Sequence, residues 1–166
     1  ADPHRAATVG QAVTTGVLCG EGKGLAPFES RAGLEAFVDL DSGLDGRHEI
    51  EYDWGAVDTY LARYHGKVSL NVATLIGNSP LRIAALGWDD VPAAEPALDR
   101  MRGLLADGMA AGAFGLRSGL DYPPGGYAPT DGLVALVAEA GPPAGILPSP
   151  VRAPRGAPPP PPPPAA

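Results

Sequence analysis

The chain has 166 residues, of which 45% are hydrophobic, and this length allows one domain with a core of its own. Its 12 Lys and Arg against 19 Asp and Glu give a net charge of −7, and aromatic residues make up 6% of the chain. This composition excludes a typical nucleic-acid-binding protein, which neutralises phosphates with basic side chains and stacks bases on aromatic rings. The single cysteine excludes an internal disulfide framework.

The N-terminus has neither an initiator Met nor the apolar region of a signal peptide. No apolar run in the chain is long enough to cross a bilayer. We therefore expect a cytoplasmic protein without a membrane or nucleic-acid partner. We also expect that the chain is either processed or a piece of a longer protein.

Short runs of apolar and β-branched residues predict three strands, at 12–18, 67–76 and 113–116. Apolar residues at helical spacing predict helices between and after them, over 30–40, 54–64, 79–86, 95–111 and from Thr130 or Asp131 onward. Asp53 is expected to cap the second helix, and Val134 is expected to face inward from the last. The alternation of strands and helices predicts a parallel α/β sheet, and in α/β barrels the loops after the strands carry the chemistry.

The composition changes close to Gly141, because 12 of the 20 prolines fall within residues 142–166. We expect residues 1–141 to form the folded part and residues 142–166 to form a Pro-rich disordered tail. The seven prolines Pro158–Pro164 favour polyproline II. One interpretation is a non-enzymatic interaction protein whose tail docks in an SH3-type or WW-type groove. The other is a disordered segment without a role.

Four segments have an order and spacing that are specific together. They are Gln11–Thr15, then Asp53–Trp54 with Tyr60–Leu61, then Asn71–Asn78 followed by Leu81–Arg82, and finally Gly112–Gly125. Over about residues 5–141 they resemble the N-acyl-D-amino-acid deacylases (D-aminoacylases) of the amidohydrolase superfamily. The resemblance implies a zinc-dependent hydrolase with a (β/α)8 barrel that cleaves the amide bond of a small-molecule N-acyl-D-amino acid.

The resemblance covers only part of such an enzyme. A (β/α)8 barrel needs about 250 residues, so we expect a partial (β/α) barrel of three or four units that self-associates through its exposed edges. The family's His-x-His lies upstream of the matched region, and its later histidines and catalytic Asp lie downstream. The resemblance therefore implies that this chain holds no catalytic residue, binds no zinc and is inactive alone.

The candidate substrate-binding residues are Tyr122, Ser118 and Arg82. The phenol of Tyr122 can donate to an amide carbonyl, and the alternative is a ring that packs over its loop. Arg82 can pair with a substrate carboxylate, and the alternative is a salt bridge on the helix surface. Ser118 belongs to the same motif as Tyr122.

Two residues are candidates for a metal ligand, Cys19 and Glu21. In the corresponding loop, Gly20–Lys23, the family's ligand position is a glycine, and Cys19 lies three residues earlier. Thiolates bind zinc well, but the alternative is a small buried hydrophobe at a strand end. For Glu21 the alternative is a solvated loop acid.

The resemblance stops after Gly141, where Pro142–Pro150 replaces the next barrel strand. Prolines delete ladder donors, so a central strand does not readily hold them. We interpret the change as a frameshift, and the alternative is a natural domain end with a proline-rich tail. Under the first interpretation residues 146–166 are disordered and dispensable, and the DNA around the reading frame distinguishes the two.

Overall fold

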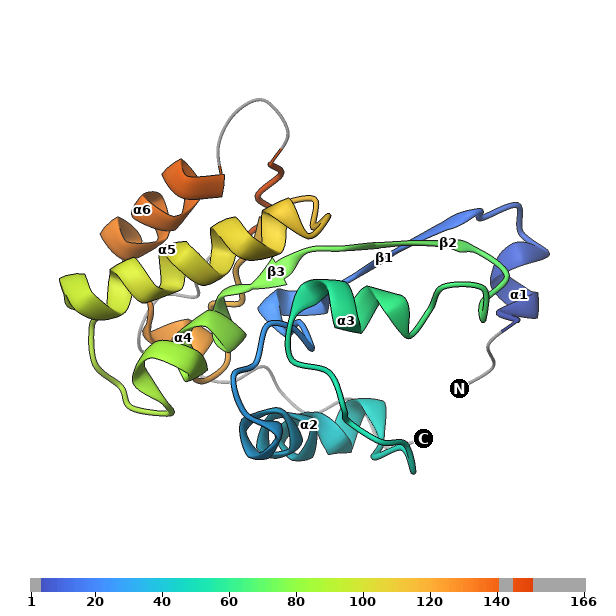
Figure 1. Cartoon of the computed structure of the whole chain (residues 1–166), viewed down its shortest axis with the longest axis horizontal. Coiled ribbons are helices and arrows are strands. Elements are labelled where there is room, and N and C mark those ends of the chain that lie inside the picture. The colour runs from blue at the N-terminus through green and yellow to red at the C-terminus, as the bar shows by residue number, and fades with distance from the viewer. Residues whose placement is uncertain (1–3, 141–144, 151–166) are drawn as a thin grey trace, which may run out of the picture.

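The computed structural model describes residues 4–140 and 145–150. The predicted polyproline run at 158–164 lies outside these residues. The described residues contain four strands: β1 (Thr15–Leu18), β2 (Asn71–Thr74), β3 (Ile76–Gly77) and β4 (Leu116–Arg117). Figure 1 shows β1 and β2 side by side, with β3 continuing the line of β2.

All the strand pairs are parallel. Thr15 of β1 lies opposite Asn71 of β2, and Ile76 of β3 lies opposite Leu116 of β4. The ladder is continuous between the two pairs, because the Phe114 N–H donates to the Thr74 carbonyl at 2.9 Å. The predicted parallel α/β arrangement is therefore confirmed, and the described strands form an open sheet rather than a closed barrel.

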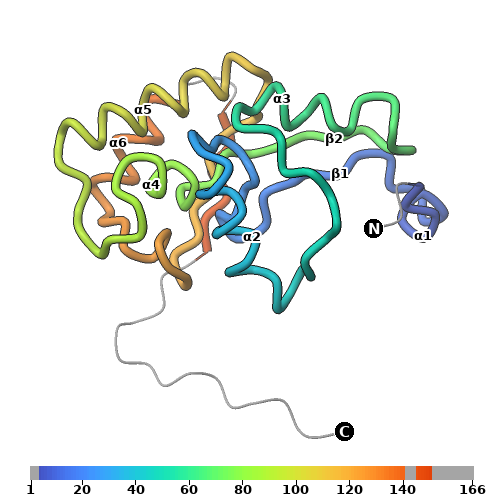
Figure 2. The backbone as a smooth tube through the Cα atoms, turned by 60° about the horizontal axis from the view of Figure 1, so that its bottom comes forward, coloured from blue at the N-terminus to red at the C-terminus, as the bar shows by residue number. Residues whose placement is uncertain are grey.

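The helices follow the strands in the expected alternation. They are α1 (Ala6–Val9), α2 (Arg31–Asp45), α3 (Val57–Ala62), α4 (Asn78–Leu86), α5 (Glu95–Ala110) and α6 (Thr130–Ala140), with short 3-10 turns η1 (Gly20–Gly22) and η2 (Gly125–Tyr127). Figure 2 shows α1 beside the N-terminus, at the far end of the β1–β2 pair from α4, α5 and α6. The N-terminus of α2 is capped by Ser30, whose Oγ accepts from the Gly33 N–H at 3.1 Å.

One hydrophobic core joins the helices to the sheet. Its largest fully buried apolar side chains come from five helices, α2 to α6, and from the strands β3 and β4. They are Leu34, Phe37, Val57, Ile76, Leu81, Leu105, Leu116 and Leu136. The predicted helical spacing holds in α5, where Leu98, Met101 and Leu105 share the buried face.

Two details of the helices differ from the prediction. Helix α3 begins at Val57, and its N-cap is Ala56, which makes no side-chain capping bond. Asp53 instead pairs with Arg63 at 3.2 Å, so a charge pair replaces the expected cap. In α6, Val134 is 62% exposed, because the described segments around α6 cover only the Leu136 side of the helix.

The described part of the predicted tail, residues 145–150, lies against β4. Ile146 pairs in parallel with Gly115: its N–H donates to the Phe114 carbonyl and its carbonyl accepts from the Leu116 N–H. Pro148 has no N–H to give, but its carbonyl accepts from the Ser118 N–H at 3.4 Å. This stretch does not fit the expectation of disorder from residue 146, because an edge position needs only some of the ladder bonds.

The sheet keeps apolar surface that no described segment covers. Val17 is 61% exposed, Phe114 is 56% exposed and Ile146 is 52% exposed. Val17 lies on β1, whereas Phe114 and Ile146 lie beyond β2 on the next two segments of the sheet. We call these three exposed side chains the apolar strip. Among residues 4–140 and 145–150, no helix is both long and apolar enough to span a membrane.

Candidate functional site

The carboxyl ends of the parallel strands meet at one edge of the sheet, and three loops come together there. They follow β1 (residues 19–24), β3 (at the start of α4) and β4 (residues 118–127). In parallel α/β folds this edge is where ligands bind. We call this group of loops the strand-end cluster.

Asn78, the first residue of α4, ties the loop after β4 to the end of β3. Its side chain is fully buried. The Oδ1 atom accepts from the Gly119 N–H at 2.9 Å, and the Nδ2 atom donates to the Gly125 carbonyl at 3.1 Å. One amide therefore pairs the buried Gly119 N–H, and it adds a second donor to the Gly125 carbonyl, which also accepts from the Ala128 N–H of its own loop at 3.1 Å.

Glycines let the loops touch through their backbones. Gly22 has a φ of +71°, and a Cβ there would collide with the backbone of Gly119. A Cβ on Gly77 would collide with the carbonyl of Gly22. No side chain fits between the three loops at these positions, so the glycines set their spacing.

Charged side chains join the same loops. Arg117 Nη2 lies 2.9 Å from Glu21 Oε1. Lys23 Nζ lies 2.5 Å from Asp41 Oδ1 and 4.3 Å from the centre of the Tyr122 ring. The loop after β1 is thus bound to the loop after β4 by an ion pair and by a cation–π contact.

The structure brings two of the three predicted substrate residues to this edge. Tyr122 is 46% exposed there, beside Lys23. Ser118 is buried, and its Oγ donates to Ser149 Oγ at 2.6 Å. The Ser118 hydroxyl therefore already has a partner.

Arg82 lies in a different environment. Its side chain is fully buried in α4, and Nη2 donates to the carbonyls of Val91 at 2.8 Å and Asp89 at 3.4 Å. Within the described residues its Nε and Nη1 atoms have no partner. Burial lowers the pKa of this guanidinium, and the charge of Asp90 opposes the shift. The alternative reading of Arg82, a salt bridge on the helix surface, is not formed, because the segment after α4 covers the side chain.

Neither metal candidate has the partners that a metal site needs. Cys19 is buried, and desolvation raises the pKa of its thiol to about 12 although the charge of Arg117 lowers it. Glu21 is paired with Arg117. Within residues 4–140 and 145–150, no three His, Cys, Asp or Glu side chains gather closely enough to hold a metal ion.

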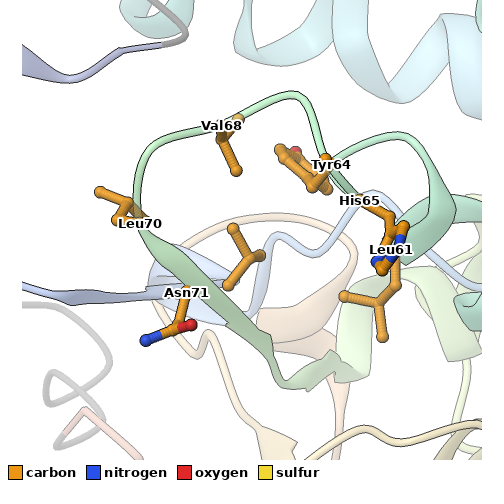
Figure 3. A pocket seen from close by; sticks show the side chains of 8 residues that line it. Leu61, Tyr64, His65, Val68, Leu70 and Asn71 are labelled. Atoms are coloured by element: carbon orange, nitrogen blue, oxygen red, sulfur yellow. The ribbon is translucent and has the colours of Figure 1, made fainter.

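A cavity of about 370 Å³ lies at the opposite, amino end of β2 (Figure 3). Its side chains come from α3, the turn after it and the start of β2: Leu61, Tyr64, His65, Val68, Leu70, Val72 and Asn71. A single histidine among mostly apolar side chains gives no acid–base pair, so this cavity has no catalytic arrangement.

Sequence reasoning missed the structural roles of Asn78, Lys23 and Arg117. The signal for Asn78 was its position, since a polar side chain directly after the buried Ile76–Gly77 strand needs hydrogen-bond partners. The partners of Lys23 and Arg117 come from segments far along the chain, so no local pattern could identify them.

Comparison with known proteins identifies relatives of the chain. No family model matches the chain. The chain is 33% identical over 136 residues to the N-acyl-D-aspartate deacylase of Alcaligenes xylosoxydans xylosoxydans. The aligned region covers 81% of this chain and 26% of that relative. It is 39% identical over 92 residues to the N-acyl-D-glutamate deacylase of the same organism, over 49% of this chain and 18% of the relative.

Solved structures agree with the sequence matches. The N-acyl-D-glutamate deacylase of Bordetella bronchiseptica, complexed with zinc and a phosphonate inhibitor, superposes with a TM-score of 0.66 and 27% identity. That match covers 84% of this chain and 28% of the relative. A D-aminoacylase with a binuclear metal centre gives a TM-score of 0.65 at 26% identity, over 79% of this chain and 27% of the other.

The chain therefore spans about a quarter of the length of the curated relatives it matches over most of its residues. The resemblance noted in the sequence is confirmed in both sequence and fold. The chain is related to the N-acyl-D-amino-acid deacylases of the D-aminoacylase group and corresponds to about one quarter of such a protein.

Proposed function

We propose that the chain is part of the (β/α)8 barrel of a zinc-dependent N-acyl-D-amino-acid deacylase, and that it supplies substrate-side loops rather than metal ligands. The observation that carries the proposal is the strand-end cluster, in which Asn78 holds Gly119 and Tyr122 lies beside Lys23, at the edge that binds ligands in such barrels. The similarity to deacylases extends over this region.

The order of the strands supports a barrel segment. β1, the β2–β3 line, β4 and the stretch around Ile146 lie side by side in chain order, all parallel. Each step has a helix between its strands, which is the repeated unit of a (β/α)8 barrel. The open edges and the strip at Val17, Phe114 and Ile146 are where the remaining strands and the barrel interior would lie.

Zinc does not fit the described part of this chain. A catalytic zinc needs three protein ligands, and the described residues gather no such group. Glu21 is held by Arg117, and the buried Cys19 keeps its proton. The ligands therefore belong to other parts of the barrel, and no step of the reaction is assigned to a metal on this chain.

Within this proposal Tyr122 contacts the substrate. A phenol at the ligand-binding edge can donate to the acyl carbonyl and stabilise the charge that develops there. Ser118 shapes the loop through Ser149, and Arg82 holds the segment after α4 through its carbonyl contacts. These two residues position the loops rather than contacting the reacting atoms.

The isolated chain is predicted to be inactive. With zinc added, release of D-amino acid from N-acetyl-D-methionine should not exceed that of a metal-free blank, because the ligands lie elsewhere. The assay is colorimetric detection of the free D-amino acid. Turnover above the blank that a chelator abolishes would show that the chain holds a working metal site.

A hybrid enzyme tests the proposed function itself. When residues 5–140 replace the matching stretch of the N-acyl-D-aspartate deacylase, we expect zinc-dependent hydrolysis of N-acetyl-D-aspartate. In that hybrid, Tyr122→Phe should lower kcat by about 100-fold, since loss of one donor to the developing oxyanion costs this much. Tyr127→Phe is the matched control and should change little. A folded, zinc-loaded hybrid without activity contradicts the proposal.

Loss of the Asn78 amide should loosen the strand-end cluster. Asn78→Ala leaves the Gly119 N–H buried without its partner, which costs about 1–3 kcal/mol in unfolding free energy, while the Gly125 carbonyl keeps its bond from the Ala128 N–H. Asn71→Ala is the control, because the Asn71 amide is exposed and donates to the Thr14 carbonyl at the far end of the strands. Urea unfolding measures both variants, and an equal loss in the two would contradict the role of Asn78.

We also propose that the chain self-associates through the strip at Val17, Phe114 and Ile146. Apolar surface and unpaired strand edges favour pairing with a second copy. Sedimentation should show species larger than a monomer, and Phe114→Asp should shift them to the monomer. Leu44→Asp, at a position 80% exposed on α2, should leave them unchanged. A monomer that unfolds in one sharp transition at all concentrations rules this out.

A further inference from the structure

A second cavity, of about 380 Å³, lies between the end of β1, α2 and α3. None of the proposed substrate residues Tyr122, Ser118 and Arg82 lines it. Its walls are mainly apolar, and four of the lining side chains are aromatic: Tyr52, Trp54, Tyr60 and Tyr64. A mostly apolar cavity of this size with a few polar groups is the usual form of a small-molecule site. We call it the aromatic cavity.

The four rings form a connected row. The centroids are 5.5 Å apart between Tyr52 and Trp54, 5.6 Å between Trp54 and Tyr60, and 5.3 Å between Tyr60 and Tyr64. Hydrogen bonds of the indole N–H and of the phenol hydroxyls hold these rings in place. Trp54 Nε1 donates to the Leu25 carbonyl at 2.7 Å, and the Tyr64 and Tyr60 hydroxyls lie 3.0 Å apart.

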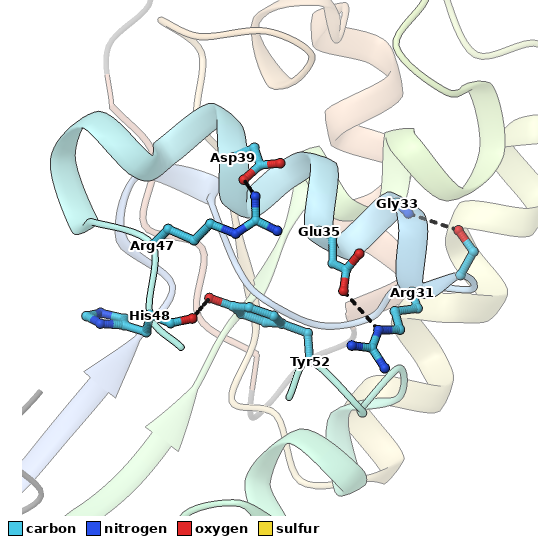
Figure 4. Close-up of polar contacts among 8 residues, drawn as sticks. Arg31, Gly33, Glu35, Asp39, Arg47, His48 and Tyr52 are labelled. Carbon is cyan, nitrogen blue, oxygen red and sulfur yellow. Dashed lines mark hydrogen bonds and ion pairs between the residues drawn. The ribbon is translucent and has the colours of Figure 1, made fainter. Parts of the chain in front are cut away.

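The loop after α2 closes one side of the cavity. Figure 4 shows this loop turning back under α2, where the Tyr52 hydroxyl donates to the His48 carbonyl at 3.3 Å. Arg47 on the same loop is paired with Asp39 of the helix. The Arg47 charge is therefore held on the outer face of α2, and this residue does not line the cavity.

The charges that do line the cavity favour a cation. The ammonium of Lys23 is already neutralised by Asp41 at 2.5 Å. Asp45 also lines the cavity, and among the described residues it has no ion-pair partner. Asp45 is the last residue of α2, so its carboxylate adds to the negative end of the helix dipole. A positively charged ligand group in the cavity would therefore be attracted to the C-terminal end of α2, and the faces of the aromatic rings would attract it as well.

We propose that the aromatic cavity binds a small aromatic ammonium compound, with the ring among the four aromatic side chains and the ammonium beside Asp45 at the end of α2. Two features support this class of ligand together: the row of rings accepts a flat apolar group, and the unpaired carboxylate with the helix end attracts a cation. The cavity shares the loop after β1 with the strand-end cluster, but none of Tyr122, Ser118 and Arg82 lines it, so the proposal does not depend on the proposed deacylase function.

Fluorescence of Trp54 reports on the cavity. In the full chain carrying Trp88→Phe, Trp54 is the sole tryptophan, so its emission follows occupancy. Three probes share one ring and differ in charge: 2-phenylethylammonium, 2-phenylethanol and 3-phenylpropionate. We expect saturable quenching or enhancement with affinity in the order ammonium, then alcohol, then carboxylate. No saturable change with any probe, or carboxylate binding as tight as the ammonium, overturns the proposal.

Two variants test the place of binding. Gly20 lines the cavity and no atom lies within 4 Å of a Cβ added there, so Gly20→Phe should fill the space and abolish binding of all three probes. Gly103 on α5 is equally open and does not line the cavity, so Gly103→Phe is the matched control. Binding that survives in a folded Gly20→Phe variant overturns the proposed place.

The charge of Asp45 has its own test. Asp45→Asn should weaken binding of 2-phenylethylammonium by about 2- to 5-fold, the range for an exposed charge at a helix end, and leave 2-phenylethanol unchanged. Because this position is on the surface, the variant keeps its fold. Equal effects of Asp45→Asn on both probes contradict the role of the carboxylate.

Discussion

The buried amide of Asn78 is the contact on which the strand-end cluster depends. It stands where β3 becomes α4 and holds Gly119 and Gly125 of a loop some forty residues further along the chain. The buried amide fixes this loop more strictly than apolar packing does, because the buried Gly119 N–H would carry a large desolvation cost without its partner. The glycine contacts between Gly22, Gly77 and Gly119 are compatible only with this spacing.

The rest of the edge follows from that spacing. With the loops after β1 and β4 in contact, Arg117 reaches Glu21, and Lys23 reaches both Asp41 and the Tyr122 ring. These contacts leave Tyr122 as the half-exposed aromatic of the edge, while Ser118 is turned to Ser149. Lys23 also connects this edge to the aromatic cavity, which it helps to line on the other side of the loop. The two sites share one ion pair and differ in all of their proposed ligand contacts.

Periodicity predicted the helices well where one face is buried. Helix α5 covers almost the predicted range, and Leu98, Met101 and Leu105 are buried as expected. The prediction was wrong where a partner decides the outcome: Asp53 pairs with Arg63 instead of capping α3, and Val134 is exposed because no described segment packs on it. For Arg82 the sequence left two readings open, a substrate carboxylate or a salt bridge on the helix surface, but the Asp89–Val91 segment folds over the side chain and takes its hydrogen bonds.

The sequence by itself determined the order of strands and helices, because this order follows from the local spacing of apolar residues. It also determined the relation to the deacylases, because this relation follows from the order of motifs along the chain. Only the tertiary structure decided which polar side chains have partners. Asn78 with Gly119, Lys23 with Asp41, Ser118 with Ser149 and the four rings of the aromatic cavity come from distant segments. Their energies depend on distances across the fold, and such distances are set by packing and not by neighbouring residues.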